Sequence, residues 1–454
     1  MRRLWVPLVL FLSLTLPHLD QGDFRRDTAL YAAVGHWMWE SGNLASPYVH
    51  PEVPYFNKPP LAILIHGLGM QIGGRDNLIA ARVPSILAGC GVLAFSMLIA
   101  SRLANSAMGL TSGIVLALSY DFFRRTREIS LDFWQLFFLT GATWLALRAL
   151  ESRQRLLWFF AAGLLIGLGL LCKPLVALVL LPILALWMAV SGRPGLILPF
   201  LAMASLGAAV SALPWHLHMV STFGDSFLSV YFGDQIANRM RGDHGSASWT
   251  YYAEMLFNYK WPWILALIFT VVTAARKRLP AETSQLLLLG GTWLLIALPA
   301  LSAFTDKQPN YALPLFPALA WICAGGIHAM KWPRFAAWRD GGYRRLAPLA
   351  VIISLVVALL PLRTQKDPDS DLLKITRVLE EEGIRADRVA GIGLQSKEIA
   401  LFYVLNGVFP VIGNEAEIEA AIVKKRVFRY NHPVLFEGDR LLLFRPVDPP
   451  PDQG

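Results

Sequence analysis

Long apolar runs separated by short polar segments occupy most of the first 360 residues of the chain. A helix needs about 20 mostly apolar residues to cross the hydrocarbon core of a lipid bilayer. The pattern therefore predicts an all-α polytopic membrane domain with about 11 transmembrane helices, in a range of about 10 to 13. The predicted spans are 4–17, 79–101, 107–123, 132–150, 156–172, 174–190, 195–219, 261–275, 285–304, 310–330 and 346–362.

The pattern changes after the last of these spans, where the polar, Asp-rich segment TQKDPDSD begins at residue 364. Helix-like segments then alternate with strand-like segments, the helices at 370–382, 396–406 and 415–425 and the strands at 389–394, 408–413 and 441–447. Such alternation is typical of a small α/β fold. We therefore predict a membrane-embedded domain over residues 1–365 and a soluble α/β domain over residues 366–454.

The first long polar loop, residues 18–60, contains an amphipathic segment at 27–42. Its apolar side chains recur at helical spacing, Asp27 stands at the expected N-cap, and Gly42 stands at the expected end. The apolar stretch that follows, 61–73, is too short to cross a bilayer. We expect in-plane helices in this loop, lying at the membrane surface.

Composition supports a membrane protein. Of 454 residues, 55% are hydrophobic and 16% are charged, and the mean hydropathy is +0.47. These values exclude a disordered chain and disfavour a water-soluble enzyme. The three cysteines lie in apolar runs, which excludes a secreted fold built on disulfides. No long Lys/Arg tract is present, so we expect no nucleic acid partner.

Basic residues beside the spans predict the orientation, because they collect on the cytoplasmic side. Alternation from a cytoplasmic N-terminus places the Arg276–Arg278 triplet inside and the C-terminal domain outside. The first span resembles a signal peptide, but no small-x-small cleavage site follows it. We therefore favour a retained anchor.

Many charged residues nevertheless fall on the predicted outer side. They are Lys58, Arg82, Arg124, Arg125, Arg127, Lys173, Arg239, Arg241, Lys260 and Lys307, with Asp27, Asp132, Asp234 and Asp306. Each cation taken alone is explained as an interface anchor. The whole set is better explained by a polar outer cavity for an anionic ligand. A lipid-linked phosphate donor fits such a cavity, because cytosolic nucleotides do not reach it.

Several motifs occur in order along nearly 300 residues of the chain. They are FRRDTALYAAVGHWMWESGN (24–43), VPYFNKPPLAILIHGLG (53–69), ARVPS (81–85), LLCKP (170–174), LPWHLHMV and FGDSFLSVYFGDQIANR within 213–239, and FTDKQPNYALPLFPALA (304–320). Together they closely resemble the bacterial protein-mannosyltransferase and aminoarabinose-transferase family. These proteins are C-type polytopic glycosyltransferases that use polyprenyl-phosphate sugars.

The resemblance implies an activity and its partners. The expected reaction is an inverting transfer of a sugar from a polyprenyl phosphate to a hydroxyl of a glycolipid, a glycan or a protein. It would take place on the outer face of the cytoplasmic membrane, in a multi-pass protein surrounded by membrane lipids.

The resemblance also assigns site residues. Asp27 and Asp132 match the two outer carboxylates, and both are expected to be catalytic, Asp27 as the base. Lys58, Arg127, Lys173, Lys307 and Tyr311 match the ligands of the donor phosphate, and Tyr55, Arg82 and Arg239 are further candidates. Structural alternatives remain open: Asp27 as a helix cap, Lys58 as an interface lysine, and Arg127 with Asp132 as a buried pair.

The chain departs from the aminoarabinose branch at three places. Thr28 and Asn57 replace acidic residues, and Gln235 stands where that branch has a histidine. These changes remove the expected metal ligands, so we assign no metal site and no cofactor, although a divalent metal stays possible for the family. They also count against aminoarabinose and lipid A as substrates.

Two other functions are compatible with the sequence. A transporter or flippase of an anionic lipid-linked substrate would also need many spans and charges within the membrane. The odd number of spans and the lack of a repeat count against it. A family member that binds the lipid carrier without turnover is the third hypothesis, which Thr28 and Asn57 keep open.

Overall fold

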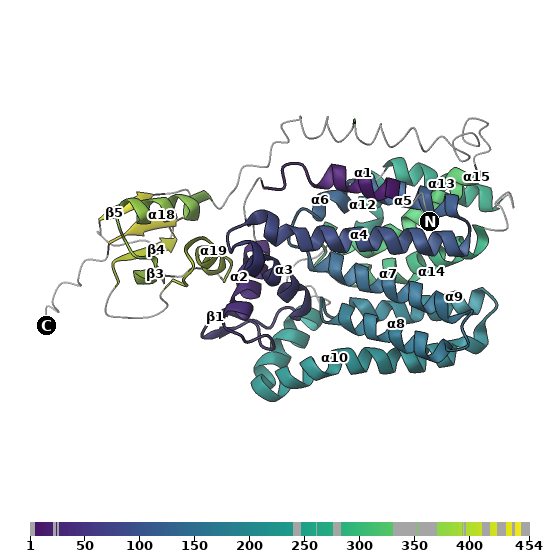
Figure 1. Cartoon of the computed structure of the whole chain (residues 1–454), viewed down its shortest axis with the longest axis horizontal. Coiled ribbons are helices and arrows are strands. Elements are labelled where there is room, and N and C mark those ends of the chain that lie inside the picture. The colour runs from purple at the N-terminus through teal and green to yellow at the C-terminus, as the bar shows by residue number, and fades with distance from the viewer. Residues whose placement is uncertain are drawn as a thin grey trace. The chain divides into compact units, whose positions relative to one another are not determined.

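A computed structural model of the chain describes a mostly helical protein (Figure 1). The described residues are 5–20, 24, 27–238, 247–259, 261–275, 283–329, 352, 370–392, 394, 396–410, 418–424, 433–437 and 441–445. The chain divides into two compact units. The helical unit comprises Met1–Leu19, Phe56–Ala62 and Val83–Leu362, and the mixed unit comprises Asp20–Tyr55, Ile63–Arg82 and Arg363–Gly454.

The helical unit contains most of the predicted spans. Its elements are α1 (Trp5–Thr15), most of α4 (Leu78–Leu103), α5 (Ser106–Ala117), α6 (Tyr120–Arg125), α7 (Leu131–Ala149), α8 (Arg155–Leu170), η1 (Val176–Val179), α9 (Leu180–Val190), η2 (Pro194–Leu196), α10 (Ile197–Leu228), the π-helical η3 (Ser229–Asn238), α12 (Tyr251–Tyr259), α13 (Trp261–Ala275), α14 (Ser284–Ser302), η5 (Pro309–Leu315) and α15 (Phe316–Ala329).

The helices follow most of the predicted spans. The spans predicted at 174–190 and 310–330 begin with the 3-10 segments η1 and η5. The span predicted at 107–123 is broken between α5, which ends at Ala117, and α6, which begins at Tyr120. The span predicted at 195–219 ends too early, because the chain stays helical as far as Asn238. The span predicted at 346–362 lies outside the described residues, apart from Ile352.

Four of the described helices are long and apolar enough to cross a membrane. They are Leu78–Leu103, Pro194–Asp234, Ser284–Ser302 and Pro309–His328. Helix α10 also carries exposed apolar side chains along its length, among them Leu198, Leu206 and Leu217. Apolar side chains on the outside of a helical bundle are what lipid contact requires, and the total number of spans stays a prediction.

Helices α8 and α10 lie side by side (Figure 1) and pack through small residues. A β-carbon added at Gly163 would lie 2.2 Å from the carbonyl oxygen of Ala204. One added at Gly207 would lie 2.2 Å from the carbonyl oxygen of Phe160. Only glycine lets the two backbones come this close, as is common between membrane helices.

The turn η5 is fixed by a buried tryptophan of α14. The indole N–H of Trp293 donates to the carbonyl oxygen of Pro314, at 2.9 Å, and its ring packs edge-on against Trp321 of α15. Both rings are almost fully buried. Because η5 also carries Asn310 and Tyr311, this contact fixes the position of two polar side chains described below.

The mixed unit joins early helices to a small sheet. Its elements are α2 (Asp27–Glu40), β1 (Tyr48–His50), β2 (Val53–Pro54), most of α3 (Leu61–Gly73), α18 (Ser370–Glu381), η7 (Ala386–Arg388), β3 (Val389–Ile392), α19 (Ser396–Asn406), β4 (Ala420–Lys424), β5 (Val434–Glu437) and β6 (Leu441–Phe444). The four-stranded sheet has the order β3-β4-β6-β5, with β3 parallel to β4 and the other pairs antiparallel.

The helices expected at 370–382 and 396–406 and the strands expected at 389–394 and 441–447 have counterparts in the structure. The strand expected at 408–413 is wrong where the structure describes it, because residues 408–410 are not in a strand, and strand β5 was not predicted.

The helix expected at 415–425 is also wrong where the structure describes it. Residues 420–424 form strand β4, between β3 and β6. Ala420 and Ala421 have a low propensity for strands. The pairing of Ile422 and Val423 with two neighbouring strands outweighs this and favours the sheet. The boundary predicted at residue 365 stays a prediction.

The packing of α8 on α10 gives a stability prediction. Replacing Gly163 with valine inserts a side chain where no space exists, so we expect the free energy of unfolding to fall by about 1–3 kcal/mol. Thermal unfolding of the purified protein in detergent measures this as a lower Tm. Gly195→Val is the matched control, because a β-carbon there meets nothing within 4 Å. Equal Tm values for the two variants would contradict the prediction.

Candidate active site

A carboxylate stands at the start of helix α7. Asp132 lies in the first turn, where the helix dipole stabilises a negative charge. Its side chain is only 11% exposed. A carboxylate this buried needs a compensating cation or several hydrogen-bond donors.

The compensating cation is Lys173, which follows α8. Its Nζ lies 2.6 Å from Oδ1 of Asp132, and its side chain is 12% exposed. The same Nζ lies 4.0 Å from the ring centroid of Tyr311 on η5, a cation–π distance. The lysine therefore has a carboxylate and an aromatic face as neighbours.

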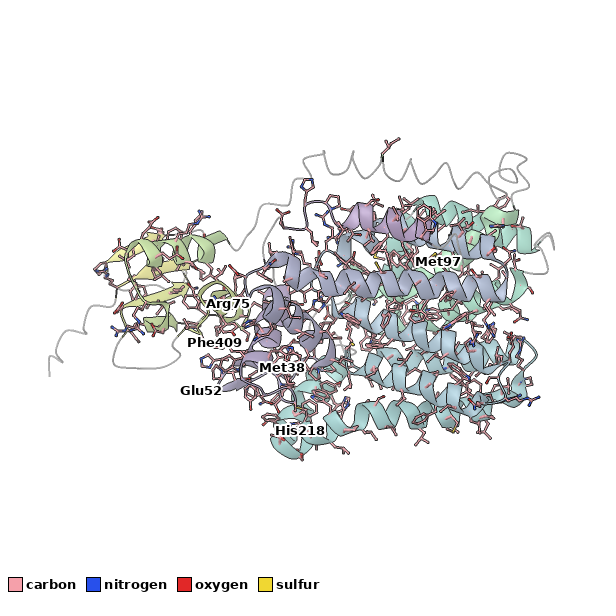
Figure 2. All side chains as sticks on the ribbon, viewed as in Figure 1. Met38, Glu52, Arg75, Met97, His218 and Phe409 are labelled. Carbon is pink, nitrogen blue, oxygen red and sulfur yellow. The ribbon has the colours of Figure 1, made fainter. Side chains whose placement is uncertain are left out.

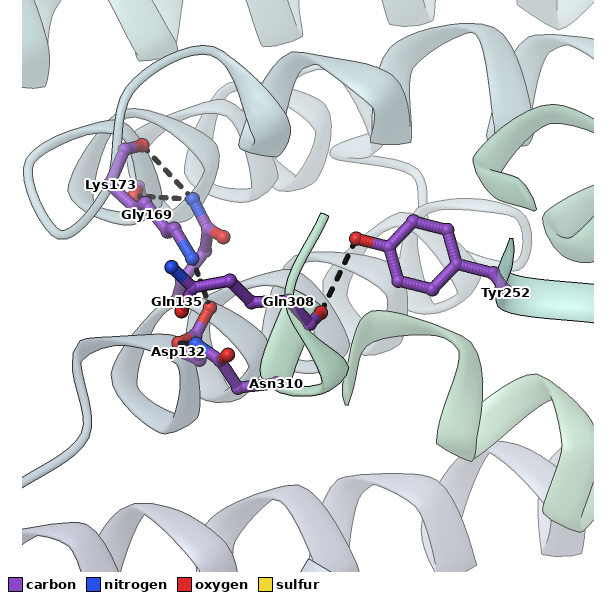
Figure 3. A network of polar contacts seen from close by, with 7 residues as sticks. All are labelled: Asp132, Gln135, Gly169, Lys173, Tyr252, Gln308 and Asn310. Atoms are coloured by element: carbon purple, nitrogen blue, oxygen red, sulfur yellow. Dashed lines mark hydrogen bonds and ion pairs between the residues drawn. The ribbon is translucent and has the colours of Figure 1, made fainter. Parts of the chain in front are cut away.

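Two amide side chains complete this polar network (Figure 3). Asn310 Nδ2 donates to Oδ2 of Asp132 at 3.3 Å, so both carboxylate oxygens are engaged. Gln135 Nε2 donates to the carbonyl oxygens of Gly169 and Lys173, at 3.3 and 3.0 Å. These bonds tie the end of α8 to α7 and to η5.

The backbone beyond Lys173 is strained. After Pro174, Leu175 has φ of 55° and ψ of −37°, a region that non-glycine residues rarely occupy. Such a residue costs about 1–3 kcal/mol and persists only where its surroundings enforce it. The strained turn fixes the direction in which the chain leaves Lys173.

An open cavity lies beside this network. Its lining combines two lysines and two aspartates with apolar groups: Lys58, Asp132, Gln135, Lys173, Pro174, Leu175, Val176, Leu301, Phe304, Asp306, Tyr311 and Pro314. The side chain of Lys58 is buried, and the residue lies in the loop between β2 and α3. A mixed lining of this kind suits an amphiphile that carries an anionic group.

The structure thus brings together Lys58, Asp132, Lys173 and Tyr311, four of the residues singled out in the sequence. The proposed Arg127–Asp132 pair is wrong, because the structure pairs Asp132 with Lys173. Arg127 instead donates from Nη2 to the carbonyl oxygen of His18, at 2.9 Å.

Other predicted residues lie elsewhere. Lys307 donates from Nζ to the carbonyl oxygen of Ala247, at 3.0 Å, and neither it nor Arg127 is among the cavity-lining residues. Asp27, Tyr55 and Arg82 belong to the mixed unit, and Arg239 lies outside the described residues. Their roles, and the convergence of Asp27 with the cavity lysines, stay predictions.

Asp27 is the first residue of α2. Its side chain is about half exposed, and Oδ1 lies 2.6 Å from Nζ of Lys397 in α19. Sequence reasoning found neither this lysine nor the two amides, Gln135 and Asn310. A single amide or lysine side chain has no distinctive sequence pattern. Its role becomes visible only when the fold brings its hydrogen-bond or ion-pair partner next to it.

The side chains around Asp132 do not form a metal site. Within the described ranges, no three His, Cys, Asp or Glu side chains are placed to share one. The network around Asp132 supplies a single carboxylate, two amides and a lysine, and a lysine ammonium cannot coordinate a cation. This donor set does not fit a divalent metal.

Comparisons with known proteins agree with the sequence motifs. The family model of dolichyl-phosphate-mannose-protein mannosyltransferases matches residues 57–218, which include Lys58, Asp132 and Lys173.

Two curated relatives are undecaprenyl phosphate-alpha-4-amino-4-deoxy-L-arabinose arabinosyl transferases 1 and 2, from two strains of Pseudomonas fluorescens. The first is 29% identical over 80% of this chain and 65% of its own length. The second is 31% identical over 70% of this chain and 59% of its own length. The chain spans less than two thirds of these relatives.

Solved structures share the fold. The crystal structure of ArnT from Cupriavidus metallidurans bound to undecaprenyl phosphate superposes with a TM-score of 0.71 at 17% identity, covering 98% of this chain and 97% of that one. An oligosaccharyltransferase of Archaeoglobus fulgidus superposes with a TM-score of 0.53 at 12% identity, covering 89% and 62%. The resemblance to the C-type membrane glycosyltransferases is confirmed.

The buried pair gives a second stability prediction. Asp132→Asn leaves the ammonium of Lys173 without its counterion, and we expect the free energy of unfolding to fall by about 3–5 kcal/mol. Adding Lys173→Met removes the uncompensated charge and should restore much of the loss. Thermal unfolding of the three proteins measures the coupling.

The matched control is the exposed ion pair between Arg385 and Asp387. Arg385→Ala should leave the Tm nearly unchanged, because water screens that pair. A double variant no more stable than Asp132→Asn alone would contradict the coupling.

Proposed function

We propose that this relative of the C-type glycosyltransferases moves a sugar from a polyprenyl phosphate to an acceptor hydroxyl, with inversion at the anomeric carbon. The observation that carries the proposal is the cavity around Asp132 and Lys173. Seven of its twelve lining residues, from Lys58 to Val176, lie within the stretch that the mannosyltransferase family model matches, and its lining combines lysines with apolar groups. The acceptor would be a glycolipid, a glycan or a protein.

The donor phosphate would bind between Lys58 and Lys173. Lysine is a good phosphate ligand, acting as a point charge with three N–H donors. Asp132 would hold the ammonium of Lys173 in place through its ion pair, and Tyr311 would lie beside the phosphate. The apolar lining around Leu301 and Phe304 would accept the first part of the lipid. Arg127 and Lys307 would act as further ligands only if the loops that carry them rearrange.

Asp27 would act as the general base. Its carboxylate would take the proton from the acceptor hydroxyl while the acceptor oxygen attacks the anomeric carbon. The bond between that carbon and the phosphate oxygen would break, and the polyprenyl phosphate would leave with the electron pair. The lysines would stabilise the phosphate as its negative charge develops.

We also propose the membrane arrangement. The chain would be a multi-pass protein of the bacterial cytoplasmic membrane with about 11 spans. Its N-terminus would be cytoplasmic, and residues 366–454 would form an extracytoplasmic α/β domain. Thr28 and Asn57 replace acidic residues of the aminoarabinose branch, so the transferred sugar would differ from aminoarabinose.

Replacement of Asp27 tests the enzymatic proposal. Asp27→Asn removes the base, and we expect kcat for sugar transfer to fall by about 10²- to 10⁴-fold. The measurement is transfer from lipid-linked donors to envelope acceptors by purified protein, with products identified by mass spectrometry. Asp20→Asn is the matched control, an exposed aspartate of the same loop, and should keep full activity.

Two outcomes would contradict the proposal. A folded Asp27→Asn protein with full activity would show that Asp27 is not the base. Movement of a lipid-linked substrate across the membrane without a covalent product would favour the transporter hypothesis instead.

A further inference from the structure

Asp27 has a partner from the far end of the chain. Nζ of Lys397, in the first turn of α19, lies 2.6 Å from Oδ1 of Asp27. Both side chains are 49% exposed, so one side of the carboxylate is engaged while the pair remains open to the surroundings. The two residues belong to the same compact unit.

Helix α19 is anchored on α2 independently of this ion pair. Tyr403 is almost fully buried, and its hydroxyl donates to Oε2 of Glu40 and lies 2.9 Å from Nδ1 of His36. Burial, and then the hydrogen bond to Glu40, raise the pKa of Tyr403 far above its usual range. The hydroxyl therefore keeps its proton and remains a donor.

A second group of contacts fixes the same helix. Nε of Arg75 donates to the carbonyl oxygen of Val404, at 3.0 Å. The ring of Phe409 stacks on Tyr403 with centroids 4.2 Å apart, and Trp37 packs edge-on against both rings. Figure 2 labels Arg75 and Phe409 beside this helix. With these anchors in place, the fold of the unit does not depend on the exposed ion pair.

The position of Lys397 is electrostatically unusual. A cation in the first turn of a helix faces the positive end of the helix dipole, which disfavours it. An exposed ion pair contributes little to stability, typically less than about 1 kcal/mol. The ion pair therefore contributes little to the stability of the fold. Its more specific effect is to orient the Asp27 carboxylate.

We propose that Lys397 is a positioning residue for Asp27, so that α19 completes the catalytic site. The ammonium fixes Oδ1, and Oδ2 is then directed toward the acceptor hydroxyl. This inference rests on the proposed function, because it takes Asp27 as the base. It assigns part of catalysis to the C-terminal segment, in addition to any part in acceptor binding.

Kinetics of substituted proteins test the role. Lys397→Met should lower kcat by about 10- to 100-fold, with KM for donor and acceptor nearly unchanged, because a misplaced base slows chemistry without weakening binding. Lys397→Arg should restore most of the rate. In the Asp27→Asn background, Lys397→Met should have no further effect. Lys374→Met, at an exposed lysine of α18, is the matched control and should behave as the unsubstituted protein.

A zero-length cross-link tests the contact without any assay of activity. A carbodiimide should join the Asp27 carboxylate to the Lys397 amine in the full-length protein, and mass spectrometry of the peptides should detect that bond. The same treatment of Asp27→Asn should not give it. Absence of the cross-link from the unsubstituted protein would overturn the proposed contact.

The results separate this inference from the function on which it rests. An active unsubstituted protein together with a fully active Lys397→Met protein would overturn the inference alone. A higher rate in Lys397→Met would also overturn it, since the ion pair would then restrain the base. An inactive unsubstituted protein would overturn the proposed function, and the role of Lys397 with it, even if the cross-link forms.

Discussion

The ion pair between Asp132 and Lys173 is the interaction on which the candidate site depends. Taking either charge alone out of water costs several kcal/mol, and the pair is tolerated because the two charges meet at 2.6 Å with further partners on both sides. Asn310 and Tyr311 supply those partners from η5. The pair therefore joins α7, the end of α8 and η5 at one point, and the cavity lies beside it.

In the proposed function, Lys173 would serve both stability and donor binding. Lys173 is fully compensated without a ligand, which keeps the cavity stable when it is empty. A donor phosphate would be a second anion next to the same ammonium, and Lys58 is a second cation in the same lining. Charge already fixed in place stabilises a developing negative charge with little reorganisation.

The sequence predicted the helices of the membrane part well, because apolar runs of this length have few alternatives in a bilayer. It also placed Lys58, Asp132, Lys173 and Tyr311 in one site through motifs spread over the chain. It failed where local signals conflict with tertiary pairing: residues 420–424 form a strand only because two neighbouring strands accept them. Gln135, Asn310 and Lys397 were missed because their partners lie far away in the chain.

The most direct measurement is an experimental structure of the protein with a polyprenyl monophosphate bound, determined in a lipid nanodisc. We expect the phosphate to lie within salt-bridge distance of Nζ of both Lys58 and Lys173, with the start of the lipid against Leu301 and Phe304. A phosphate bound at a different place, with the Asp132–Lys173 pair unchanged and remote from it, would contradict the proposed site.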